Sequence, residues 1–188
     1  MAASHCASSI WTETAKQTSA STAVNPKPST ATRSHTTTTG SENCPHTTCR
    51  WGVFGENFTT DGLLEASVHP GDRFSVGSAE VVVTQPRLPC YKLGVRFQSD
   101  DMVKRFLASG RTGFYLAVTR EGEVGAGDEI ELIAREPDSI PISEITRLYL
   151  AKTYGDNDIA YVQRALQLVA LPEGWKRYFQ ERLQRADI

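Results

Sequence analysis

The segment 85–92, with the sequence QPRLPCYK, places one thiol between two cations. Its two prolines restrict the backbone, so we expect Cys90 to be held at a fixed position directly after a β-strand. Arg87 and Lys92 flank this thiol, and neighbouring cations favour the thiolate, which is the form that acts as a nucleophile or metal ligand. A thiolate suits a soft metal, and the two cations could neutralise an anionic cofactor. A buried, inert cysteine at a strand end is the alternative, and the residues alone leave both open.

A second candidate is the segment 54–58, with the sequence FGENF. Gly55 lets the backbone approach a ligand closely, and the Asn57 side chain both donates and accepts hydrogen bonds. A turn that precedes a strand would have the same composition, so this segment by itself does not decide between a binding site and a turn.

The elements that must position these residues are mostly strands. Alternating apolar and polar residues predict strands, and apolar residues at three- and four-residue spacing predict a helix. The expected strands are 74–76, 79–83, 113–118 and 128–134, and the expected helix is 100–107, closed by Gly110. This pattern is typical of a small, mostly β barrel with one inserted helix.

Three short helices are expected after a break at residues 137–141. Ser143 is the predicted cap of the first, and Asp156 or Asp158 of the second. Pro172 lies early in the third, where its missing N–H costs least. Apolar residues recur at helical spacing in all three: Ile145, Leu148 and Tyr149; Val162, Leu166 and Val169; Trp175, Phe179 and Leu183. We interpret these sets as mutual packing in a helical domain.

Residues 1–49 have a different composition, with 8 serines and 12 threonines. Such a segment buries too little apolar surface to offset the conformational entropy of the chain, so we expect disorder and no strand there. Cys44, His46 and Cys49 offer zinc ligands, but structural zinc sites are normally braced by secondary structure. We therefore interpret their spacing as chance.

The overall composition excludes several classes of function. The chain has 188 residues and a net charge of −2, which does not favour binding to nucleic acid or to an anionic membrane. No apolar run approaches the roughly 20 residues of a membrane span. Four cysteines do not suggest a disulfide scaffold, so we expect a cytoplasmic protein. A mitochondrial address is the alternative that the Ser/Thr-rich start raises.

Several motifs, taken together and in order, resemble the MOSC (molybdenum cofactor sulfurase C-terminal) domain. They are VFGENF at 53–58, GDRF at 71–74, QPRLPCYK at 85–92, GRTGFY at 110–115 and VGAGD at 124–128. The segment from Ser143 to Phe179 is similar to the three-helix domain that follows MOSC in one branch, which includes bacterial hydroxylaminopurine reductases. The resemblance covers about residues 52–186.

This resemblance implies an α+β fold: a MOSC β-barrel related to the inserted barrel domain of pyruvate kinase, over residues 50–136, and a three-helix domain over 142–188. It implies a molybdopterin-type molybdenum cofactor, with Cys90 as the protein ligand to molybdenum and as the catalytic residue. The cofactor-contacting residues that it implies are Asn57, Arg87, Lys92, Gly55 and Gly113.

The reaction that the resemblance implies is removal of oxygen from an N-hydroxylated compound, such as an N-hydroxylated base or an amidoxime. Electrons would come from a separate flavoprotein or cytochrome. A thiol without a second cysteine nearby agrees with metal ligation better than with disulfide chemistry. The alternatives are a non-catalytic cofactor or sulfur carrier, and an inactive truncated product.

The chain also departs from the family. Relatives carry more barrel before the FGEN motif, including a His-Gly-Gly segment that is missing here. We therefore expect a partial barrel with open strand edges. One hypothesis is that part of residues 1–49 is a reading-frame artefact.

Overall fold

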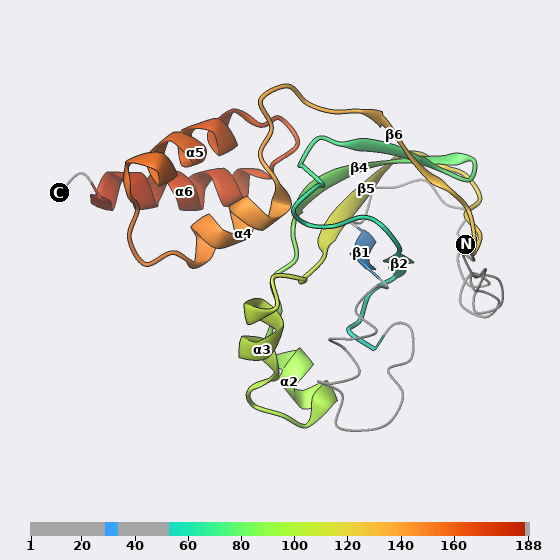
Figure 1. Ribbon diagram of the computed structural model, residues 1–188, viewed down its shortest axis with the longest axis horizontal. Coiled ribbons are helices and arrows are strands. Elements are labelled where there is room, and N and C mark those ends of the chain that lie inside the picture. Colours follow the sequence, from blue (N-terminus) through green and yellow to red (C-terminus); the bar gives the residue numbers. More distant parts are fainter. Residues whose placement is uncertain (1–28, 34–52, 187–188) are drawn as a thin grey trace, which may run out of the picture.

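A computed structural model describes residues 29–33 and 53–186 of the chain (Figure 1). The strands are β1 (Ser29–Arg33), β2 (Phe58–Thr60), β3 (Arg73–Val76), β4 (Ala79–Pro86), β5 (Phe114–Arg120) and β6 (Ile130–Ala134). The helices are α2 (Tyr91–Phe97), α3 (Met102–Ala108), α4 (Ile142–Leu150), α5 (Asp156–Gln167) and α6 (Glu173–Ala186). The mixed helix and sheet architecture confirms the predicted α+β class and the C-terminal three-helix region.

The six described strands form one sheet in the order β2-β1-β5-β4-β3-β6. Only the β1–β2 pair is parallel, and the other four neighbouring pairs are antiparallel. Among the described strands β2 and β6 are the two ends of the sheet, so these strands do not close on themselves. The partial barrel that was expected stays a prediction.

The core of the sheet comes from alternating residues on its strands. Phe74, Val76 and Val83 are buried, and Phe114 and Leu116 of β5 pack in the same cluster. The tight turn between β3 and β4 needs a positive φ, which Gly77 supplies at +56°; glycine adopts this conformation without steric cost. The predicted strands at 74–76, 79–83, 113–118 and 128–134 are confirmed, with small shifts at their ends.

One strand lies where none was expected. β1 falls inside residues 1–49, and it is an interior strand, because it pairs with β2 on one side and with β5 on the other. The expectation of no strand in that range is wrong for Ser29–Arg33. The prediction failed because a strand's partners are distant in sequence, and pairing can outweigh the weak local preference of a Ser/Thr-rich segment. The other residues of 1–49 lie outside the described residues, as do Cys44, His46 and Cys49.

Two helices, rather than one, are inserted between β4 and β5. α3 confirms the helix expected at 100–107, whereas α2 was not predicted. The two helices share a small core of buried residues, formed by Leu93, Phe97, Met102 and Phe106. Only two of the seven residues in α2 are buried, so its sequence has too short an apolar stripe to be recognised as helical.

The three C-terminal helices pack around one apolar cluster, which includes Ile145, Leu148, Val162 and Phe179. The predicted mutual packing is thus confirmed, with an exception at Val169. Its side chain is 86% exposed, whereas Leu168 is 2% exposed. The cause is the early end of α5: Leu168 has an extended backbone conformation, so the helical phase no longer applies at Val169.

The predicted caps also differ from the observed ones. Pro141 is the N-cap of α4, and Ser143 lies within the first turn. Gly155 is the N-cap of α5, and its N–H donates to the Asp158 carboxylate over 3.1 Å. Asp158 therefore stabilises the start of the helix from the third position of its first turn, as acidic residues commonly do.

Polar contacts gather where the sheet leads into the three-helix domain. The Asp72 side chain is fully buried, and both of its oxygens accept hydrogen bonds from Arg135 at 2.8 Å. His69 lies next to this pair, with its Nδ1 2.9 Å from the Ser139 hydroxyl. Ile142 of α4 belongs to the apolar core of the sheet, so the first turn of α4 is part of both units. In the described part of the chain, no helix is long and apolar enough to cross a membrane.

We predict that proline at Ala31 destabilises the protein. Proline removes an N–H from a strand with neighbours on both sides, and proline is tolerated in sheets mainly at edges. Ala31→Pro should lower the free energy of unfolding by about 2–4 kcal/mol, and Ala31→Ser by less than about 1 kcal/mol. Chemical denaturation measures both. Equal stability of the two variants would show that β1 does not belong to the sheet.

We also predict that acid weakens the fold through His69. Burial lowers the pKa of His69 below its ordinary value of 6.5, the nearby Arg135 and Arg164 lower it further, and Asp72 and Ser139 act in the opposite direction. Between the lowered pKa and 6.5 the unfolded chain binds more protons than the folded one, so stability is complete above about pH 6.5 and falls below it. Urea unfolding at acidic and neutral pH measures how much free energy of unfolding is lost on acidification. The loss should be smaller for His69→Gln than for the natural chain. Identical losses would contradict this role.

Candidate functional site

Phe54 packs against the helices inserted between β4 and β5. Its ring lies 5.1 Å from the ring of Phe97 and 5.2 Å from that of Phe106, measured between centroids. Aromatic pairs at this separation are favourable beyond the area that they bury. The FGEN segment is therefore fixed to α2 and α3, although it lies more than thirty residues earlier in the chain.

The residues after Phe54 form a tight turn. The Phe54 N–H donates to the Glu56 carboxylate over 3.0 Å, and Gly55 has a φ of +78°. A residue with a side chain would be strained in this conformation, which explains the glycine. Asn57 follows this turn and is exposed, so its amide is accessible to a ligand.

Arg87 joins three parts of the site. Its guanidinium donates to the Phe54 carbonyl and lies over the Phe106 ring at 5.7 Å, while its backbone N–H donates to the Gly113 carbonyl over 3.0 Å. Burial lowers the pKa of Arg87, and the nearby Tyr115, Glu56 and Cys90 act in the opposite direction. Arg87 and the Cys90 thiol are thus close enough to interact electrostatically.

Cys90 is exposed and is a free thiol. It is the N-cap of α2, with an extended backbone conformation, and its carbonyl accepts the N–H of Leu93 over 2.9 Å. The alternative of a buried, inert cysteine is therefore wrong. The thiol does not follow the strand directly as expected, because three residues separate it from the end of β4 and it immediately precedes a helix.

Glu65 holds the start of β5 in place from a buried position. Its side chain accepts the N–H of Gly113 over 2.8 Å, and the residue is only 4% exposed. Gly113 has a φ of +80°, which again favours glycine. Because the Gly113 carbonyl also accepts the Arg87 N–H, Glu65 acts on the site through this glycine.

The predicted site residues therefore fall into two groups. Arg87 is in direct contact with Gly113, and a Cβ on Gly55 would lie 3.8 Å from its guanidinium. Cys90 interacts with Arg87 electrostatically. Asn57 and Lys92 are exposed, one after the FGEN turn and one in the first turn of α2, and their role stays a prediction.

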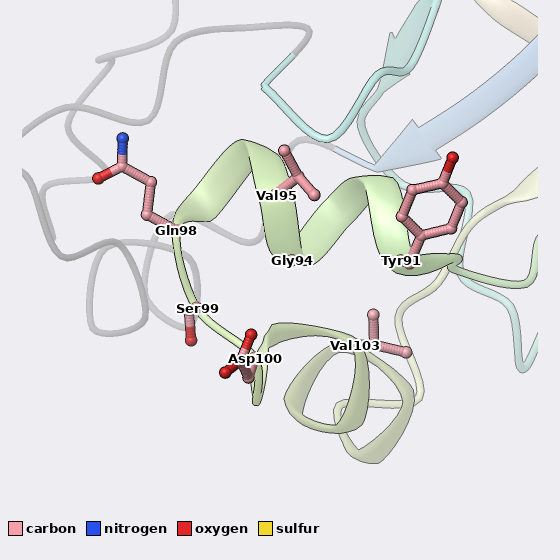
Figure 2. A pocket seen from close by; sticks show the side chains of 7 residues that line it. All are labelled: Tyr91, Gly94, Val95, Gln98, Ser99, Asp100 and Val103. Carbon is pink, nitrogen blue, oxygen red and sulfur yellow. The ribbon is translucent and has the colours of Figure 1, made fainter.

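A shallow groove of about 490 Å³ lies between α2 and α3 (Figure 2). It is lined by Tyr91, Gly94, Val95, Gln98, Ser99, Asp100 and Val103. Tyr91 directly follows Cys90, so the groove begins next to the thiol, but no predicted cofactor residue lines it.

The donor set of the predicted site residues fits a soft metal on an anionic cofactor. It combines one accessible thiol with an exposed lysine two residues later and an exposed amide at Asn57, and thiolates select soft metals. The described residues include no group of three or more histidine, cysteine, aspartate or glutamate side chains placed to hold a metal ion. A zinc-type site built from several protein ligands is therefore not present among them.

Comparison with known protein families identifies two domains in the chain. The MOSC domain matches residues 23–131, which is more than half of the chain. The chain belongs to the MOSC domain family. The YiiM-like 3-alpha helix domain matches residues 140–186, in agreement with α4, α5 and α6.

Curated relatives of this MOSC protein are bacterial and fungal. The protein YflK of Bacillus subtilis is 38% identical over 71% of this chain and 59% of its own length. The protein YiiM of Escherichia coli is 35% identical over 69% of this chain and 56% of its own length. A protein of Gibberella moniliformis named "Reductase" is 31% identical over 58% of this chain and 20% of its own length. The chain thus spans less than three fifths of the length of these relatives.

Solved structures show the same architecture. YiiM from Geobacillus stearothermophilus superimposes with a TM-score of 0.75 at 32% identity, over 82% of this chain and 77% of that one. YiiM from Escherichia coli superimposes with a TM-score of 0.72 at 30% identity, over 83% and 77% of the two chains.

Sequence reasoning missed two residues that organise this MOSC site. Phe54 was noted as part of a motif but not as the contact between that motif and the helices. Glu65 was not considered, because a glutamate in a loop is usually exposed and nothing in its neighbouring residues signals burial.

We predict that Arg87 stabilises the site more than its neighbour Lys92 does. Arg87→Met should leave the Phe54 carbonyl without its donor and lower the free energy of unfolding by about 1–3 kcal/mol. Lys92→Met, at an exposed position, should change it by less than about 0.5 kcal/mol. Guanidinium denaturation measures both, and an equal effect of the two substitutions would refute the contacts assigned to Arg87.

Proposed function

We propose that this MOSC protein binds a molybdopterin-type molybdenum cofactor through Cys90 and reduces N-hydroxylated compounds. The observation that carries the proposal is the accessible Cys90 thiol at the start of α2, within electrostatic reach of Arg87. A buried or disulfide-bonded cysteine could not reach a cofactor, and this one is neither.

Each site residue has a distinct role in the proposal. Cys90 is the ligand to the metal. The exposed Lys92 and Asn57 are free to contact the anionic and polar parts of the pterin. Arg87 acts mainly as a positioning residue, because its guanidinium is committed to the Phe54 carbonyl and the Phe106 ring. It holds the FGEN turn next to the thiol.

The packing of Phe54 on α2 and α3 supports a rigid site. Since the turn that carries Gly55 and Asn57 is anchored to the same helices that carry Cys90 and Lys92, the two halves keep one relative position. Such preorganisation lowers the cost of binding a ligand that contacts both.

The reaction that we propose is two-electron cleavage of an N–O bond. An N-hydroxylated compound, two electrons and two protons yield the amine or amidine and water. When bound, the molybdenum cofactor supplies the centre that accepts the oxygen atom. The name of the Gibberella relative, "Reductase", agrees with this class of reaction. The substrate would be a small N-hydroxylated base or an amidoxime.

We predict that Cys90→Ser abolishes molybdenum retention and leaves the stability of the fold within about 1–2 kcal/mol. The test is molybdenum content by mass spectrometry after expression of the full chain in a host that makes the cofactor. The matched control replaces the three other cysteines, Cys6, Cys44 and Cys49, with serine, and should keep the metal.

The outcomes separate the alternatives. Metal content unchanged by Cys90→Ser would refute the assigned ligand. Metal bound through Cys90 without reduction of N-hydroxylated bases or amidoximes by a chemical reductant would support a non-catalytic carrier instead.

A further inference from the structure

An apolar stripe lies exposed on α2. The side chains of Tyr91 and Val95 are 73% and 71% exposed, and residues four positions apart lie on the same face of a helix. Figure 2 shows both residues on α2, with Val103 on the neighbouring α3. Tyr91 and Val95 thus give α2 a small exposed apolar surface, and exposed apolar surface of this kind is one mark of a partner contact when other features adjoin it.

The segment that carries this stripe is rich in positive charge, although Asp100 also lines the groove. Residues 91–111 carry five lysines and arginines against two aspartates. This segment therefore has a formal charge of +3 in a chain whose total is −2, so the other residues together carry −5. On α2, Lys92 follows Tyr91 and Arg96 follows Val95, so the two cations lie beside the apolar stripe. Both are exposed. On α3, the exposed Lys104 follows Val103, which lines the groove.

The stripe is continuous with the candidate active site. Tyr91 is the residue after Cys90 and begins both α2 and the groove. A protein docked on α2 would thus lie directly beside the thiol, which is where electrons must arrive if the proposed reduction takes place there.

We propose that the exposed face of α2, with Tyr91 and Val95 at its centre and Arg96 and Lys104 at its rim, docks an acidic electron-transfer protein. The identity of the partner as an electron donor rests on the proposed function. Its acidic character rests on the charge of residues 91–111 alone. Complementary charge speeds encounter between the partners, and a small patch with an aromatic centre agrees with the limited size of transient redox interfaces.

The test is binding of a purified flavodoxin, an acidic flavoprotein, to the full chain labelled with nitrogen-15. NMR titration should perturb the amides of α2 and of the groove more than those of the three-helix domain. Raising the salt from about 20 mM to about 200 mM should weaken binding, since exposed charges are screened. Cytochrome c, a basic electron-transfer protein, serves as the probe of opposite charge and should not bind.

Charge reversal locates the surface. Arg96→Glu combined with Lys104→Glu should weaken flavodoxin binding by about tenfold or more. The matched control, Lys152→Glu combined with Arg177→Glu, makes the same change of net charge on exposed positions of the three-helix domain and should alter binding by less than about twofold. Circular dichroism and melting temperature check that both double variants fold.

The outcomes of these experiments decide the matter. The docking surface is supported if flavodoxin perturbs the amide signals of α2 and if only the Arg96→Glu/Lys104→Glu variant loses flavodoxin binding. No binding, binding centred elsewhere, or equal effects of the two double variants overturns it. Because the titration needs no metal, docking without molybdenum retention would refute the proposed function and keep the surface. Retained molybdenum that dithionite reduces, without flavodoxin binding, would refute the surface and keep the function.

Discussion

The position of the candidate site depends on one buried carboxylate. A buried polar side chain is tolerated only where hydrogen bonds replace its hydration, and Glu65 meets this condition by accepting the N–H of Gly113. Its backbone carbonyl accepts the N–H of Ser143 in the first turn of α4. One residue therefore fixes both the start of β5 and the start of the three-helix domain, and through Gly113 it also fixes the backbone of Arg87.

Around this constraint the site is assembled from segments that are far apart in the chain. The Phe54 ring joins the FGEN turn to α2 and α3. The Phe54 carbonyl accepts a hydrogen bond from the Arg87 guanidinium, which joins the same turn to the residue after β4. Cys90 lies between these two contacts in the chain. The motifs of the MOSC family that bring the segments together act largely as packing residues, and the accessible polar groups are few.

Much of this could be predicted from the sequence, and the exceptions share a physical cause. Strands β3 to β5 and the three C-terminal helices have local periodicity that agrees with their observed burial, whereas β6 is found where it was predicted but is largely exposed. β1 and Glu65 were missed because their structure comes from distant partners, in β2 and β5 for the strand and at Gly113 for the carboxylate. α2 was missed because two buried residues make too short a pattern. The sequence singles out Cys90 by its flanking charges. Its position at the start of a helix could not be predicted, because α2 depends on packing against the distant Phe54.

The place of β1 in the sheet has a consequence for synthesis on the ribosome. Ser29 pairs with Leu116, a separation of 87 positions (29 to 116), so the strand leaves the exit tunnel long before its antiparallel partner exists. At the usual translation rate of about 5–20 residues per second, the delay is about 4–17 s. The three-helix domain, by contrast, is built from contacts among helices that are neighbours in the chain. Until β5 is made, β1 can pair only with β2, so one edge of β1 stays exposed to other strands during this interval.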